Sequence, residues 1–251
     1  MTDNFEPTPN AEVMAPPAPI GERFVDVFTA PVKAMKGVAE RPAWVIPCLV
    51  LFAIMALYTA ANVHIMVPEQ SEMSLAFASN EQAAGLEQQI EMFLEPPLWL
   101  RLVAGIGAGL TVVIFTILIP GLLMHLFLKL SGGVAQAGQT LGVVFWSGLI
   151  AYGLRTILGW IIIVVTGSAR HAGLTATSFM SDPNPQSVPY MLAGLYGDPF
   201  MYWMMFVVVL GLAIVHRLEF SRVAIVAVAT YVLLSAIPIG FTLLGQAFSG
   251  R

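Results

Sequence analysis

Charged residues are scarce in this chain of 251 residues: Asp, Glu, Lys and Arg make up 10% of it, while 57% is hydrophobic. A soluble domain carries about 25% charged residues, so this chain lacks the ions that cover a water-facing surface. The mean hydropathy of +0.80 agrees with that deficit. The apolar residues also form blocks longer than the core elements of soluble proteins. The composition predicts an integral membrane protein whose main contact is the lipid bilayer.

Basic residues, cysteine and metal-ligand patterns are scarce as well. Only 11 Lys and Arg residues are present, and no basic patch has interleaved aromatics, which excludes nucleic-acid binding. The single cysteine, Cys48, cannot form an internal disulfide. The histidines show no HExxH or HxxxH spacing, so we expect no metal and no cofactor. Ser147 in "VFWSGL" lacks the GxSxG pattern of a serine nucleophile. With no catalytic constellation, we expect a protein that is not an enzyme.

Five apolar runs are long enough to cross a hydrocarbon core of about 30 Å as helices. They predict an all-α, polytopic membrane bundle with spans at about residues 43–66, 98–128, 141–166, 199–215 and 223–247. The second run exceeds the bilayer without any turn residues, so we expect one tilted or kinked helix. Pro120 in "LIPG" and Pro238 in "AIPIG" are the expected kinks. The acidic, Pro-rich residues 1–19 predict a disordered cytoplasmic tail, ahead of a transmembrane domain over 20–251.

The distribution of basic residues predicts the orientation. Arg101 and Arg155 fall inside apolar runs and do not count toward it. The N-terminal side of the membrane holds Arg23, Lys33, Lys36, Arg41, Lys129, Arg217 and Arg222, whereas the other side holds only Arg170 and Arg251. The positive-inside rule then predicts a cytoplasmic N-terminus and an external C-terminus.

The segment before the first span predicts an amphipathic helix at the inner leaflet. Thr29 is its expected N-cap, and Pro31 suits a first helical turn. Val32, Met35 and Val38 fall on one apolar stripe. The lysines beside this stripe would face anionic lipid headgroups. The alternative is an ordinary juxtamembrane linker that carries topology charges.

The loop between the first two spans predicts a second amphipathic helix. Ser79 and Gln82 have capping-box spacing, and an apolar stripe of Leu86, Ile90 and Phe93 follows. This helix would lie over the outer mouth of the bundle or on the bilayer. Its excess of Glu favours packing on protein.

The order of several phrases along the chain is similar to a known family. A basic "FTAPVKAMKGVAERPAWVIPCLV" precedes an outer "EQAAGLEQQIEMFLEPP", and "GGVAQAGQTLGVVFWSGL" precedes the closing "DPFMYWMMFVVVLGLAIVHRLEFSRVAIVAV". Over roughly residues 22–245, this order resembles the bacterial branch of the Yip-domain family, five-span proteins related to the Ypt/Rab-interacting proteins. The resemblance implies a compact five-helix bundle in a bacterial cytoplasmic membrane, with a role in membrane organisation, assembly or transport. The chain lacks a "DLYGP"-like stretch, so the Rab GTPase binding of eukaryotic members is not carried over.

Arg155, near the middle of the third run, is the strongest candidate for a polar site inside the membrane. A central Arg costs on the order of 3 kcal/mol to insert. Since no Asp or Glu lies within a span, we expect carbonyls, hydroxyls such as Thr230 or Ser235, water or an anionic lipid as its partners. The guanidinium faces the bundle interior or snorkels to the outer surface.

Two further groups of residues have structural interpretations. Gly105 and Gly109 have the small-xxx-small spacing of close helix contacts, within the bundle or at a homodimer face. Exposed cations would form a cytoplasmic interface: Lys33, Lys36, Arg41, Arg217 and Arg222.

The sequence supports two functions. The first is a non-enzymatic scaffold that binds a membrane-protein partner or a second copy of itself. The second is a small transporter, channel or lipid-handling protein that uses Arg155 and the proline-kinked helices.

Overall fold

The structure is a computed structural model that describes residues 19–78, 80–180, 184 and 187–248. The predicted tail up to residue 18 and the final residues 249–251 lie outside this part. Five helical rods are long and apolar enough to cross a membrane, as predicted. They are α3 (Val45–Leu75), α5–η1–α6 (Leu98–Thr111, Val112–Leu118, Ile119–Leu130), α7–η2–α8 (Ala137–Gly148, Leu149–Leu154, Arg155–Thr166), α10 (Pro199–His216) and α11 (Phe220–Phe248). We call these spans 1 to 5.

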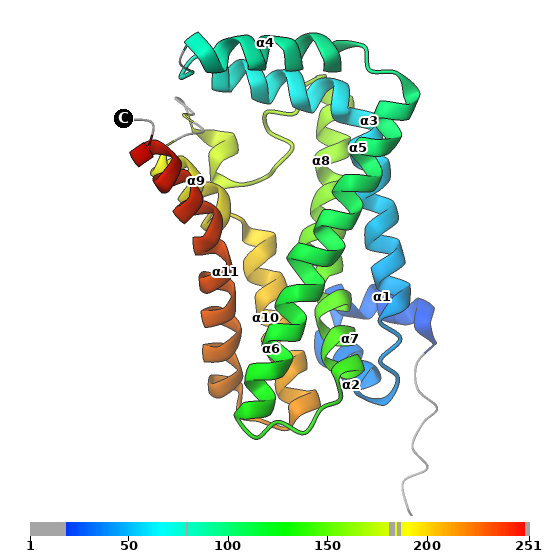
Figure 1. The fold of residues 1–251 in the computed structure, drawn as a ribbon. Helices are drawn as coiled ribbons and strands as arrows, with labels where there is room; N and C mark the ends of the chain where they lie inside the picture. The colour runs from blue at the N-terminus through cyan, green and yellow to red at the C-terminus, as the bar shows by residue number, and fades with distance from the viewer. Residues whose placement is uncertain (1–18, 79, 181–183, 185–186, 249–251) are drawn as a thin grey trace, which may run out of the picture.

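The other elements are short and lie at the two ends of the rods (Figure 1). Near one end are α1 (Ile20–Thr29) and α2 (Pro31–Glu40), along with the α6–α7 and α10–α11 turns. At the other end are α4 (Asn80–Leu94), the 3-10 turn η3 (Ala176–Phe179) and α9 (Val188–Tyr196). The described residues form helices and no strands, which agrees with the predicted all-α class.

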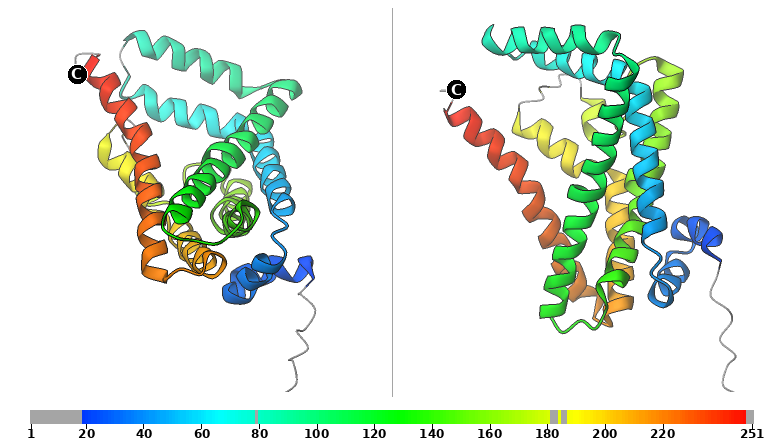
Figure 2. Two further views of the ribbon diagram at one scale, coloured as in Figure 1. Left: turned by 60° about the horizontal axis from the view of Figure 1, so that its bottom comes forward. Right: turned by 45° about the vertical axis from the view of Figure 1, so that its right-hand side comes forward.

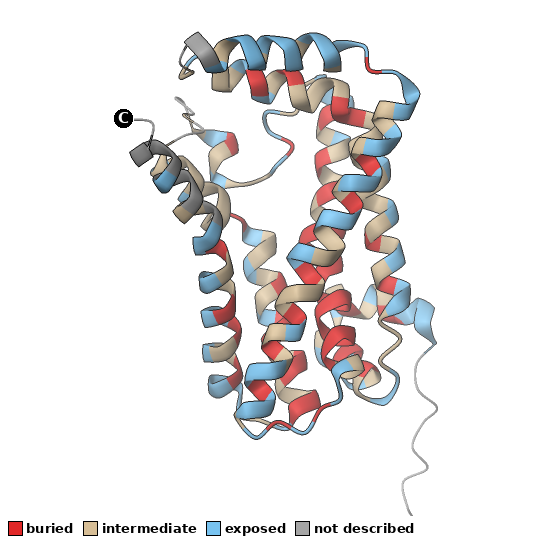
Figure 3. Ribbon diagram, viewed as in Figure 1, coloured by how far each residue is buried: buried red, intermediate tan, exposed pale blue. Residues whose placement is uncertain are grey.

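Span 3 is the core helix of the bundle. After its first turn, α7 is buried on every side from Thr140 to Gly148, and Figure 3 shows most of α7 in red. Phe145, Trp146 and Ile150 of span 3 are fully buried, as is Leu212 of α10. Spans 1, 2 and 4 pack against span 3, and span 5 packs on spans 2 and 4. Apolar side chains such as Val165, at the far end of span 3, lie on the outside of the bundle, where they face hydrocarbon.

Spans 2 and 3 each contain a π-helical segment, η1 and η2. η1 ends just before Pro120, and the Ile119 amide bonds the Ile114 carbonyl, which is the wide i→i−5 spacing. Pro120 has no amide to donate, so an irregular turn ahead of it keeps the rod continuous. Pro238 falls within α11, but its side chain lies outside the described residues.

Two glycines let span 2 lie against span 1. A methyl group on Gly105 would lie 2.4 Å from the Ala56 carbonyl oxygen, and one on Gly109 would lie 2.8 Å from the Phe52 ring. Both positions therefore require glycine for α5 to approach α3 this closely. This glycine surface of span 2 packs against span 1 inside the bundle, so the surface is not available as a homodimer face.

The first span is longer than the predicted 43–66. α3 continues through Pro68 to Leu75, and its last turns swing away from the span to run beside α4 (Figures 1 and 2). Proline tends to bend a helix and does not always end it. α4 packs on this part of α3 with Leu86, Ile90 and Phe93 half-buried. Ser79, the expected cap of α4, lies outside the described residues.

Two expectations for the segment before span 1 were wrong. Thr29 does not cap a helix that follows it: it is the last residue of α1, and its hydroxyl bonds the Val25 carbonyl. Val32 is 46% exposed, whereas Met35 and Val38 are fully buried. The reason is that α2 packs against α7 and α10, so protein covers the apolar face that was expected to meet lipid. Pro31 does occupy the first helical position.

Candidate functional site

Arg155 lies at the start of α8, directly after η2, and donates from Nη1 to Oδ2 of Asp198. Asp198 is the N-cap of α10, and its other oxygen accepts from the amides of Phe200 (2.9 Å) and Met201 (3.3 Å). The Asp198 side chain is 2% exposed and that of Arg155 is 24% exposed. One carboxylate therefore neutralises the Arg155 charge and also satisfies the first turn of span 4.

This pairing corrects the expected partners of Arg155. Asp198 sits one residue before the predicted fourth span, but α10 begins beside α8, which brings the carboxylate to the guanidinium. Thr230 instead donates to the Val226 carbonyl of its own helix, and Ser235 bonds Tyr196. Arg155 turns toward the protein, and the three residues do not form one hydrogen-bonded site.

Tyrosine hydroxyls join the helices next to the ion pair. Tyr196 of α9 bonds Ser235 of α11 at 2.8 Å, and Tyr231 of α11 donates to the Leu195 carbonyl at 2.8 Å. Tyr202 of α10 donates to the Tyr196 carbonyl at 2.6 Å. These bonds fasten α9 to α10 and to α11.

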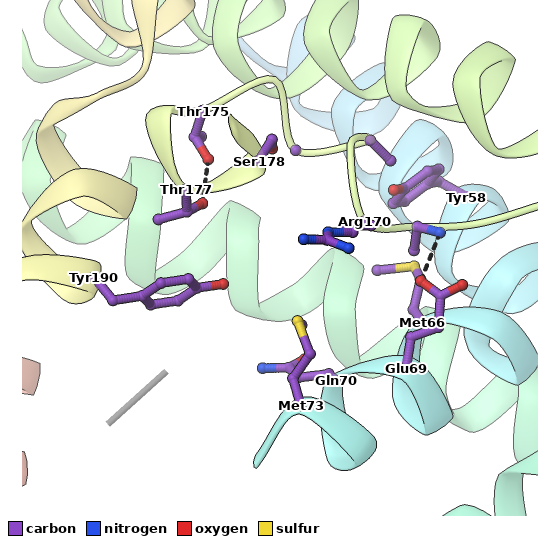
Figure 4. Close-up of a pocket in the computed structure, with 13 residues that line it drawn as sticks. Tyr58, Met66, Glu69, Gln70, Met73, Arg170, Thr175, Thr177, Ser178 and Tyr190 are labelled. Carbon is purple, nitrogen blue, oxygen red and sulfur yellow. Dashed lines mark hydrogen bonds between the residues drawn. The ribbon is translucent and has the colours of Figure 1, made fainter. Parts of the chain in front are cut away.

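A pocket of about 270 Å³, lined by both polar and apolar residues, lies between α3, the loop after α8, and α9 (Figure 4). The Arg170 guanidinium extends into it beside Gln70, Met73 and Tyr190. Glu69 holds one wall, since it accepts from the Ala169 amide (2.8 Å) and the Ser168 hydroxyl (3.2 Å). Sequence reasoning treated Arg170 only as a topology charge, because the loop that places it has no recognisable motif.

Near the opposite end, Arg23 is 1% exposed and forms no ion pair within the described ranges. Its Nη1 donates to the Arg41 carbonyl at 2.8 Å, and its guanidinium carbon lies 5.4 Å from the centre of the Trp146 ring. Burial lowers the pKa of Arg23 from its ordinary value. The cation therefore fastens α1 to the end of α2 through a hydrogen bond and to the core helix through a cation–π contact.

The cations predicted to form an interface lie at this same end. Lys33 pairs with Asp26 (2.9 Å) and Glu22 (3.7 Å), and the hydrogen bond to Asp26 raises the pKa of Lys33. Arg222 donates to the Ser131 carbonyl and joins the two turns. The structure leaves the side chains of all the predicted cations exposed: Lys33, Lys36, Arg41, Arg217 and Arg222.

Three polar side chains meet at the same end of the core. The Thr140 hydroxyl lies 2.9 Å from His125 Nδ1 and 2.9 Å from His216 Nε2, which links spans 2, 3 and 4. In the part of the chain that the structure describes, no three His, Cys, Asp or Glu side chains group as a metal site. Through the Thr140 hydroxyl, half-buried His125 and buried His216 help to hold these three spans together.

Five apolar helical rods in the described part of the chain, one of them largely buried among the others and joined to a second by an ion pair, define a polytopic α-helical membrane protein. The Yip1 domain family model matches residues 25–242, so the chain belongs to the Yip1 domain family, as the order of its sequence phrases indicated. Comparisons with curated proteins and with solved structures find no match.

Proposed function

We propose that this Yip1 domain protein is a non-enzymatic membrane scaffold that binds a protein partner through helices outside the bilayer. The observation that carries the proposal is the Arg155–Asp198 pair. The charge that would have marked a transport site is used to hold span 3 to span 4. Under this proposal the Arg155–Asp198 pair is a structural joint, which means that it holds two spans together and does not bind a substrate.

The helices outside the spans suit a partner-binding role because they are firmly placed. α2 packs on α10 and α7, and α4 packs along the end of α3. α4 directs Glu87, Gln88 and Glu91 away from the protein, and α2 directs Lys33 and Lys36 outward. A rigid helix that presents charged side chains loses little conformational entropy when a partner binds.

The orientation is part of the proposal. The exposed cations gather at the end where α1 and α2 lie, and the glutamates of α4 lie at the other end. By the positive-inside rule, the α1–α2 end faces the cytoplasm of a bacterial inner membrane and α4 faces outside.

The alternative, a small transporter, channel or lipid-handling protein built around Arg155, requires the guanidinium to be free for a ligand. Its pairing with a carboxylate that is 2% exposed opposes this role. Flux through reconstituted vesicles should therefore not depend on Arg155.

Site-specific photo-crosslinking in native membranes tests the scaffold. A photoreactive residue at exposed Glu91 of α4, or at exposed Lys36 of α2, should give a discrete protein adduct that charge reversal at neighbouring exposed positions abolishes. The matched control is Val164, which is 73% exposed on the lipid-facing side of α8 and should give lipid adducts only. Discrete protein adducts at Val164 but none at α2 or α4 would contradict the proposal.

A further inference from the structure

A second cavity lies within the membrane-spanning part of the molecule. It measures about 310 Å³, near the lower end of the roughly 300–1,000 Å³ typical of ligand pockets. Spans 2, 3, 4 and 5 all contribute to its wall, and α9 contributes Leu195.

Both π-helical segments border this cavity. η1 contributes Phe115 and Thr116, η2 contributes Tyr152, and Pro120 follows η1 on the same wall. Such segments are rare in helices and occur frequently at functional sites. The irregular backbone segments of two spans thus border one cavity.

The chemistry of the lining suits an apolar occupant. Met124 of span 2 and Met201, Met204 and Met205 of span 4 all line the cavity, and methionine side chains adapt their shape to irregular apolar partners. A buried water needs two to four polar partners. The Tyr231 hydroxyl already bonds Leu195, and the Ser235 hydroxyl bonds Val232 and Tyr196. Most of the cavity wall is apolar, so an apolar occupant suits it better than water.

The mouth of the cavity faces the bilayer. Phe115 is 65% exposed and Thr116 is also exposed, on the apolar outside of span 2. The phase that surrounds this surface consists of acyl chains, and an unfilled apolar hollow loses its dispersion contacts.

We propose that this cavity is a binding site for one acyl chain of a membrane lipid, held between η1, α10 and α11 against the methionines of α10. The site is separate from the partner-binding surfaces of the scaffold. The acyl-chain proposal would therefore remain valid if photo-crosslinking at α2 and α4 found no protein partner.

The experiment uses the full-length protein in phosphatidylcholine vesicles that contain a trace of phosphatidylcholine with a photoreactive diazirine in its acyl chain. After illumination, mass spectrometry measures adducts on the α10 peptide that contains Met201, Met204 and Met205. Thr116→Trp places a bulky ring at the mouth and should reduce these adducts several-fold. Thr111→Trp is the matched control, since Thr111 is exposed on the same span but does not line the cavity, and it should leave them unchanged.

Adducts on the exposed face of α8, at Val164 and Val165, should be equal in all proteins. Leu234→Trp fills the cavity from α11 and gives a second test if Thr116→Trp does not fold. Equal α10 labelling in the blocked and control variants would overturn the proposal.

Discussion

Arg155 in span 3 and Asp198 at the start of span 4 form an ion pair within the membrane-spanning bundle. Asp198 also accepts two amides of its own helix, so the pair fixes where α10 begins relative to α8. A buried carboxylate with three donors is well satisfied, and a guanidinium with a carboxylate partner avoids most of the cost of an isolated charge in lipid.

The contact between spans 1 and 2 gives the first prediction. Gly105→Ala should destabilise the protein, because the added methyl would lie 2.4 Å from the backbone oxygen of Ala56 and spans 1 and 2 would have to separate. Overpacking of this kind costs about 1–3 kcal/mol. The free energy of unfolding in mixed micelles measures the effect.

Gly107→Ala is the control for that change. Gly107 lies on the same helix, and a methyl group there would meet nothing within 4 Å. Its unfolding free energy should equal or slightly exceed that of the wild type, since Ala is the better helix former. Equal stability of the two variants would show that spans 1 and 2 do not approach this closely.

The docking of α2 gives the second prediction. Gly142→Ala would bring a methyl group to 2.6 Å from the Pro42 backbone oxygen and to 2.8 Å from Val38, so α2 should loosen from α7. Hydrogen exchange should then speed up in the amides of α2 and stay unchanged in the core of α10. Gly138→Ala, whose nearest neighbour is a Pro42 carbon at 3.9 Å, should exchange like the wild type. Unchanged protection of α2 in Gly142→Ala would contradict the docking.

The proposed orientation gives the third prediction. In a Cys48→Ala background, cysteine replaces exposed Glu91 on α4 or exposed Glu219 between spans 4 and 5. A membrane-impermeant maleimide added to intact cells should label the Glu91→Cys protein and leave the Glu219→Cys protein unlabelled until the cells are lysed. The reverse pattern would place the N-terminus outside.

The five spans could be predicted because length and hydropathy are local properties of the chain, and lipid admits few other spanning structures. The end of span 1 could not be predicted, because a proline such as Pro68 can either end a helix or bend it. Which of the two occurs depends on what packs beyond the proline, and here α4 packs on the part of α3 that follows Pro68. The stripe of α2 was misplaced at Val32 for a similar reason, because the position of α10 determines which face is buried. Helical periodicity alone does not contain that information.

The candidate site was predictable only in part. Arg155 stands out in the sequence because it lies inside an apolar run. Its partner could not be predicted, because it depends on the depth in the membrane at which α10 begins. That depth is set by the packing of α10 on span 3 and by the tyrosine bonds that fix α9 beside it. The acyl-chain cavity has even less of a local signature, since four spans and α9 line it and the π segments that border it have no sequence motif.

The measurement that most directly tests the central claim, that Arg155 and Asp198 form a structural joint, is a double-mutant cycle of unfolding free energy in micelles. Asp198→Asn keeps a capping side chain and removes the charge, and Arg155→Met removes the cation. Each single change should cost about 3 kcal/mol, because it leaves one uncompensated buried charge, and the double variant should cost clearly less than the sum. Additive or negligible losses would contradict the account, and Arg155 would then be free to serve a ligand.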